Sequence, residues 1–102
     1  MAINRSKVQA QAQKYVIKGQ TDKAIKEYLT LYEDDPGDLK VSQKLGDLYI
    51  KKGDKDGARK YSQPVIDDYS HKGFYLKAIA VLKQLLRLDS KQFDLNLPQF
   101  QS

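Results

Sequence analysis

The sequence predicts an all-α fold made of antiparallel helix pairs. Apolar residues recur three and four positions apart, which places them on one face of a helix, and short turns containing glycine or aspartate separate these stretches. In the clearest stretch, Leu45 and Tyr49 lie on one stripe, and Gly53 suits the end of that helix. Asp54 suits the cap of the next helix, because its carboxylate can accept the free N–H groups of the first turn. No stretch between the turns alternates apolar and polar residues as a strand does, so we expect no sheet.

Five helices are expected in chain order, joined by short connections. They cover residues 4–18, 21–33, 39–52, 55–70 and 74–88. Gly46 lies within the apolar stripe of the third helix, where the missing side chain lets another helix approach closely. Pro64 lies inside the fourth helix and removes a backbone hydrogen bond at a cost of about 3 kcal/mol, so we expect a kink there or a break just before it. After the fifth helix, Pro98 forbids a long helix through the tail.

Composition limits the classes of protein to which the chain can belong. A length of 102 residues, 40% of them hydrophobic, is that of one small domain with a thin core. No apolar run approaches the roughly 18 residues of a membrane span, and the N-terminal residues lack the apolar segment of a signal peptide. We therefore expect a cytoplasmic protein without membrane contact. The absence of cysteine excludes disulfides, thiolate metal sites and cysteine nucleophiles.

The net charge of +5 suggests nucleic-acid binding, but the distribution of charge argues against it. Basic residues are interleaved with acidic ones, which is typical of a solvated helical surface. We therefore expect a partner-binding face and keep RNA or DNA binding as an alternative. The residues that would serve this alternative are Lys51, Lys52, Lys55, Arg59 and Lys60.

An internal repeat is the strongest feature of the sequence. The pairs separated by 34 residues are Ala12 and Gly46, Tyr15 and Tyr49, Gly19 and Gly53, and Ala24 and Ala58. A second offset, of 20 residues, relates Gly53 to Gly73 and Ala58 to Ala78. The fourth helix therefore ends one helix pair and begins the next.

This pattern resembles the tetratricopeptide repeat (TPR) family, whose 34-residue unit carries Leu-Gly-x-x-Tyr, a later alanine and a closing proline. The residues that match best are Leu45, Gly46, Tyr49 and Ala58. The resemblance covers about two and a half repeats in residues 1–90. It leaves residues 91–102 as a tail or as the start of a truncated further repeat.

The resemblance implies a right-handed stack of antiparallel helix pairs, a TPR-like α-solenoid of about five helices with a C-terminal tail. It also implies a concave groove lined by the first helix of each pair. Such modules are usually non-catalytic scaffolds that bind a peptide or helix of a partner protein. The best-known groove of the family clamps a carboxylate with lysine, asparagine and arginine. Only Lys60 of this chain matches that set, so an intact clamp is not expected.

The candidate partner-binding residues are the non-core positions of the first, third and fourth helices. Amides can hydrogen-bond an extended backbone, and lysines attract a carboxylate or an acidic motif. The candidates are Gln9, Gln13, Lys40, Gln43, Lys44, Asp47, Lys60, Gln63 and Asp67. The competing interpretation is that these are ordinary solvated residues of charged helix faces.

The last helix suggests an alternative function. About three repeats are needed for independent stability, so its outer face needs a cover: a longer chain, the tail, a second copy or a partner. A self-assembling adaptor would use the apolar residues of this helix and the tail, namely Leu82, Leu86, Phe93, Leu97 and Phe100.

No enzymatic chemistry is predicted. His71, the single histidine, lies at an expected helix end, where it can interact favourably with the negative pole of the helix dipole. The acidic cluster 33–38 is typical of turns and caps and lacks the ligand spacing of a calcium loop. There is no phosphate-binding glycine loop and no nucleophile–base motif. We therefore expect no enzyme activity, cofactor or metal. The seven tyrosines are expected to pack between helices.

Overall fold

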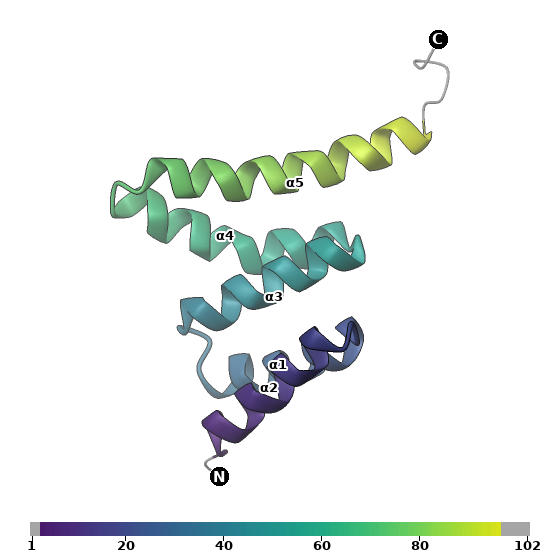
Figure 1. Cartoon of the computed structure of the whole chain (residues 1–102). Helices are drawn as coiled ribbons and strands as arrows, with labels where there is room; N and C mark the ends of the chain where they lie inside the picture. The colour runs from purple at the N-terminus through teal and green to yellow at the C-terminus, as the bar shows by residue number, and fades with distance from the viewer. Residues whose placement is uncertain (1–2, 97–102) are drawn as a thin grey trace.

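The computed structural model describes the backbone of residues 3–96 and the side chains of residues 3–90. Within this part the chain forms helices joined by short turns, with no strand (Figure 1). The helices are α1 (Arg5–Ile17), α2 (Thr21–Asp34), α3 (Leu39–Lys52), α4 (Lys55–His71) and α5 (Tyr75–Asn96). The predicted all-α fold is confirmed, and four of the five helices begin and end within one or two residues of the expected positions.

Side-chain caps explain where the middle helices begin. The Asp38 carboxylate accepts the backbone N–H of Lys40 at 3.1 Å and caps α3, as the sequence predicts. Asp54 caps α4 by accepting the N–H of Gly57 at 3.0 Å. Between these helices, Gly53 has a φ of 84°, a left-handed conformation that glycine adopts without the steric penalty of a side chain. This local chemistry produces the tight turn between α3 and α4.

Each helix packs against the next one along the chain, and together they form a stack (Figure 1). The most deeply buried large side chains, Tyr28, Leu31 and Leu45, lie where α2 meets α3 and its neighbours. Small residues allow the helices to approach: Ala58 is fully buried, and a Cβ added to Gly46 would lie 2.5 Å from the Ser62 hydroxyl oxygen. The repeated small positions therefore serve close packing, as the sequence predicts.

Two local expectations need correction. No break precedes Pro64, because α4 runs through it as one helix. Pro64 itself is exposed. The next two residues, Val65 and Ile66, are buried, so the part of α4 that follows the proline still packs in the stack. The fifth helix does not end near Leu88 but continues to Asn96, since no glycine or proline follows before Pro98.

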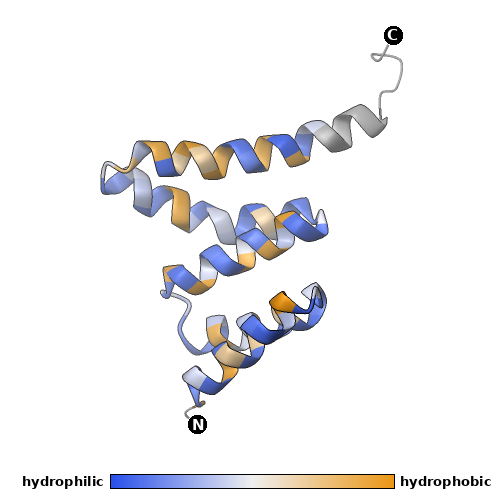
Figure 2. Ribbon diagram, viewed as in Figure 1, coloured by the Kyte–Doolittle hydropathy of each residue, from blue (hydrophilic) through white to orange (hydrophobic). Residues whose placement is uncertain are grey.

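Apolar residues are distributed differently at the two ends of the stack. Figure 2 shows that α1 is mostly hydrophilic, apart from an apolar spot near its C-terminal end. Ile17, the last residue of α1, is 86% exposed. Apolar residues are instead spread around α5, which is in contact with α4 and, to a lesser extent, α3.

Candidate functional site

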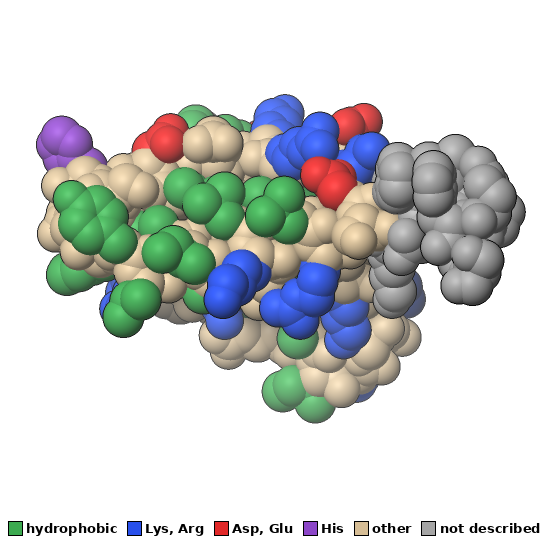
Figure 3. All heavy atoms as spheres, turned by 90° about the horizontal axis from the view of Figure 1, so that it is seen from above, with side chains coloured by type: hydrophobic (Ala, Val, Ile, Leu, Met, Phe, Trp, Pro, Cys, Tyr) green, Lys and Arg blue, Asp and Glu red, His purple; other side chains and the backbone are tan. Residues whose placement is uncertain are grey.

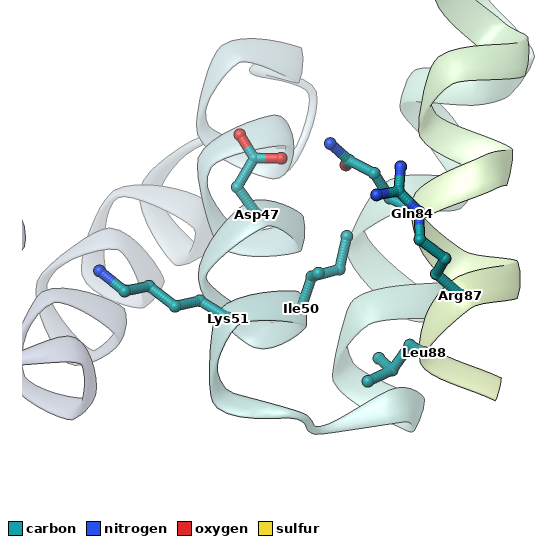
Figure 4. A pocket seen from close by; sticks show the side chains of 6 residues that line it. All are labelled: Asp47, Ile50, Lys51, Gln84, Arg87 and Leu88. Carbon is teal, nitrogen blue, oxygen red and sulfur yellow. The ribbon is translucent and has the colours of Figure 1, made fainter. Parts of the chain in front are cut away.

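Three hollows meet on the side of the stack where α1, α3 and α5 are exposed. One hollow of about 380 Å³ lies between α1 and α3, and a second, of about 340 Å³, lies further along the same two helices. The third, of about 440 Å³, lies between α3 and α5 (Figure 4). Asp47 lines all three. We call these hollows, with Asp47 at their common point, the central trough.

The trough between α1 and α3 contains most of the predicted binding residues. The hollows there are lined by the α1 and α3 candidates, namely Gln9, Gln13, Lys40, Gln43, Lys44 and Asp47. All six side chains are exposed to solvent. The structure therefore brings together residues of two helices that are not consecutive in the chain.

The three α4 candidates do not line these hollows. The ammonium of Lys60 lies 5.3 Å from the centre of the Tyr61 ring, and Gln63 donates a hydrogen bond of 2.9 Å to Asp67 along α4. The physical reason is alternation in the stack: α3 and α5 border the same hollow, so α4, which connects them, lies on the other side. The structure does not bring these three residues together with the other six.

The α5 side of the trough was missing from the predicted set. Figure 4 shows Gln84 and Arg87 of α5 extending toward α3, across the hollow from Asp47. Their spacing of three residues places them on one side of a helix. This spacing is a usable sequence signal, but the 20-residue offset directed attention to α4 as the third contributor.

Charge is arranged unevenly along the trough. At the α1 end, the Arg5 guanidinium binds Asp34 at 2.6 Å and Asp38 at 2.8 Å, so these charges are paired within the chain. The other basic side chains that line the trough form no ion pair within residues 3–90; they are Lys40, Lys44, Lys51 and Arg87. The trough therefore has positive charge available for an external carboxylate.

Asp47 is electrostatically unusual although its side chain reaches solvent. The surrounding protein displaces water from the carboxylate, and this burial raises the pKa of Asp47, while the nearby Lys44 ammonium acts in the opposite direction. A partner cation or amide that reached this point would find an acceptor with incomplete hydration.

An apolar surface adjoins these charges. Val16 and Ile17 of α1 line the second hollow together with Leu48 and Tyr28 from the core. The Val16 side chain is 36% exposed and that of Ile17 is 86% exposed, whereas Leu48 and Tyr28 are buried. An apolar side chain of a partner would contact hydrocarbon here without displacing any internal contact.

The basic residues proposed for nucleic-acid binding do not form one uninterrupted surface. Lys52 pairs with Asp22 at 3.0 Å, and Arg59 pairs with Asp89 at 2.7 Å. Lys55 also approaches Asp89, at 4.0 Å. These acidic partners lower the net positive charge that a phosphate backbone would meet.

A metal site and a membrane span each place structural requirements on the described residues. No group of three or more histidine, aspartate or glutamate side chains there could hold a metal ion. His71 is exposed in the last turn of α4, the position predicted for it. Among the described residues, no helix is both long and apolar enough to span a bilayer.

Comparison with known proteins identifies one segment. The family model described as tetratricopeptide repeat matches residues 39–66, which comprise α3, the turn after it and the first two-thirds of α4. No curated protein matches the chain, and no solved structure matches it. Repeats of this family generally mediate contacts between proteins.

Proposed function

Residues 39–66 are a tetratricopeptide repeat set in a stack of helices, and from this we propose that the chain is a non-catalytic scaffold that binds a segment of a partner protein in the central trough. The observation that carries the proposal is the meeting of three hollows at Asp47, with exposed amides and unpaired basic side chains around them.

The lining indicates the chemistry of the partner. Lys40 and Lys44 favour carboxylates, and the glutamines of α1 can donate to and accept from an extended backbone. The apolar surface at Ile17 suits one aliphatic or aromatic side chain. An acidic segment with a single apolar anchor therefore fits the trough best.

A charge-reversal experiment tests this assignment. The double variant Lys40→Glu/Lys44→Glu is compared with the wild type in binding short fluorescent peptides that carry one leucine among aspartates and glutamates. We expect the wild type to bind these peptides and the variant to lose at least about tenfold in affinity, because attraction becomes repulsion. Peptides with the acids replaced by lysines should not bind the wild type.

The matched control is Lys7→Glu/Lys26→Glu, which makes the same change of charge at exposed positions that do not line the three hollows. It should bind acidic peptides with nearly wild-type affinity. An equal loss of affinity in both double variants would show that the peptides are attracted by the net charge of the protein and not by a specific site. Absence of binding by the wild type would reject the trough as the binding surface for acidic segments.

A further inference from the structure

A second surface lies on α5, and none of its apolar residues lines the trough. Tyr75, Ile79, Leu82 and Leu86 follow one another at spacings of four, three and four residues, which places them on one stripe of the helix. All four are exposed, and Leu86 is 63% exposed. Figure 3, a view onto α5, shows apolar side chains gathered along this face. We call these four residues, with the neighbouring Leu76 at 84% exposure, the α5 stripe.

Packing among residues 3–90 does not account for the stripe. The side of α5 that packs in the stack carries Ala78, which is buried, and Val81 and Leu85, which are half-buried. A helix that is apolar on two sides is normally covered on both. The outermost helix of a repeat stack normally has a polar outer face. The described residues therefore leave the stripe open to contact.

The charges beside the stripe indicate what that molecule carries. Lys83 and Arg87, one turn apart, lie along one edge, are exposed and form no ion pair within residues 3–90. On the other edge, Asp89 is already bound by Arg59 at 2.7 Å, with Lys55 at 4.0 Å. Both edges thus present cationic side chains, and the acid among them is neutralised within the chain.

We propose that the α5 stripe binds an amphipathic helix of a partner protein whose apolar face is bordered by aspartate or glutamate. The apolar spacing of four and three residues is the pattern that two packed helices share. Acidic residues at the borders of the incoming helix would meet Lys83 and Arg87 and fix its register. Arg87 also lines the third hollow, but Lys83 and the apolar residues of the stripe line none of the hollows, so the proposal does not require the trough to bind a peptide.

A second copy of this chain fits the stripe less well. In an antiparallel pair related by a two-fold axis near residue 85, Lys83 of each helix would face Arg87 of the other. A parallel pair would bring Lys83 toward the edge where Lys55 and Arg59 stand. Either arrangement places cations against cations, which opposes association.

Of the residues predicted for self-assembly, Leu82 and Leu86 belong to the stripe, while the side chains of Phe93, Leu97 and Phe100 lie outside the described residues.

The test uses the full chain and two synthetic helical peptides with the same leucine stripe, one bordered by glutamates and the other by lysines. Binding is measured by fluorescence anisotropy at low salt. We expect the glutamate-bordered peptide to bind the wild type and the lysine-bordered peptide not to bind. Lys83→Glu should weaken binding about tenfold, and Leu76→Gln/Leu86→Gln should abolish it.

The controls separate this surface from general effects. Lys26→Glu on α2 changes the charge equally and should leave the affinity unchanged, and Lys40→Glu/Lys44→Glu should also leave it unchanged if the site is distinct from the trough. Because Leu76 and Leu86 are largely exposed, both glutamine changes should preserve the circular dichroism spectrum and melting temperature. Sedimentation should show a monomeric wild type.

Three results would overturn the proposal. The first is equal binding of the two peptides or no binding of either. The second is a loss of affinity in Lys26→Glu as large as in Lys83→Glu. The third is a wild type that sediments as a dimer while Leu76→Gln/Leu86→Gln sediments as a monomer, which would assign the stripe to a second copy.

Discussion

Tyrosines are buried in the middle of the stack, whereas on α5 a tyrosine is exposed. In the middle, Tyr61 of α4 stands edge-on to Tyr32 of α2, with ring centres 5.1 Å apart, and stacks on Tyr49 of α3 at 5.5 Å. Tyr61 is 6% exposed. On α5, Tyr75 is 64% exposed. Residue type alone therefore does not decide whether a tyrosine belongs to the core.

The number of neighbouring helices explains the contrast. α3 and α4 each pack against helices on both sides, whereas α5 has its main neighbour in α4. Each unit of a repeat stack depends on the next one to cover its apolar face. Stability should therefore be concentrated between α2 and α4, and the capacity to bind a partner helix should be concentrated on α5.

The same substitution in the two regions tests this contrast and has the largest expected effect. Tyr61→Ala removes both aromatic contacts and leaves a cavity, so we expect the free energy of unfolding to fall by about 3–5 kcal/mol. Tyr75→Ala, at an exposed site, should change it by less than about 0.5 kcal/mol. Urea unfolding followed by circular dichroism measures both. Similar losses at the two positions would show that α5 contributes to the core as the middle helices do.

The second largest loss of stability is expected where α3 and α4 approach each other closely. A Cβ added to Gly57 would lie 2.5 Å from the Tyr49 ring, so Gly57→Ala must displace the ring that stacks on Tyr61. Overpacking costs about 1–3 kcal/mol, and the better helix propensity of alanine returns up to about 1 kcal/mol. We expect a net loss of about 1–2 kcal/mol in urea unfolding.

Gly37 provides the control for this change. An added Cβ there meets only the Asp35 carboxylate, at 3.4 Å, and Gly37 lies in an exposed turn. Gly37→Ala should stay within about 0.5 kcal/mol of the wild type. If Gly57→Ala were equally neutral, the contact between α3 and α4 would be looser than the stacked rings indicate.

A smaller effect concerns the start of α3. Asp38→Ala removes the oxygen that accepts the N–H of Lys40 and Val41 and should lower the free energy of unfolding by about 1 kcal/mol. Asp38→Asn keeps an acceptor for the cap but loses the charge that pairs with Arg5, and it should cost less. The exposed Ser90→Ala on α5 should cost nothing measurable. Equal losses for the alanine and asparagine variants would assign the effect to the ion pair with Arg5 in place of the cap.

The parts of the fold that depend on neighbouring residues could be predicted from the sequence. Asp38 and Asp54 start helices and Gly53 ends one, because caps and turn glycines act within a few positions of themselves. Gly46 also marked the close packing of α3, because the repeat placed a small residue within an apolar stripe. Pro64 shows the limit of local rules. Its lost hydrogen bond predicted a kink or a break; the break is wrong, because α4 continues through Pro64 and the two following residues are buried.

The site could be predicted only in part, because its floor depends on which helices lie side by side. Gln9 and Lys44 line one wall each, as the alternation of helices in the resembling family implies. Gln84 and Arg87 join Asp47 only because α5 returns to the side of α3. Their spacing of three residues indicates a shared side of the helix, but it does not say which helix that side faces. The residues assigned to α4 failed to join the trough for the same reason.

The smallest expected effect is at Asp47, where the two regions of the stack meet. Burial raises the pKa of this carboxyl above its ordinary value of 3.8, so the folded state holds the proton to a higher pH than the unfolded chain does. Stability from this group is therefore greatest at low pH and falls as the pH rises through the folded pKa. Below pH 3.8, Asp47→Asn should have the same free energy of unfolding as the wild type. At neutral pH the variant should be more stable, by no more than about 0.5 kcal/mol, because the side chain reaches solvent. Adding Lys44→Met, which removes the opposing cation, should widen the stability difference that Asp47→Asn produces. A difference that grows toward low pH would show that the carboxylate is stabilised in the trough and not desolvated there.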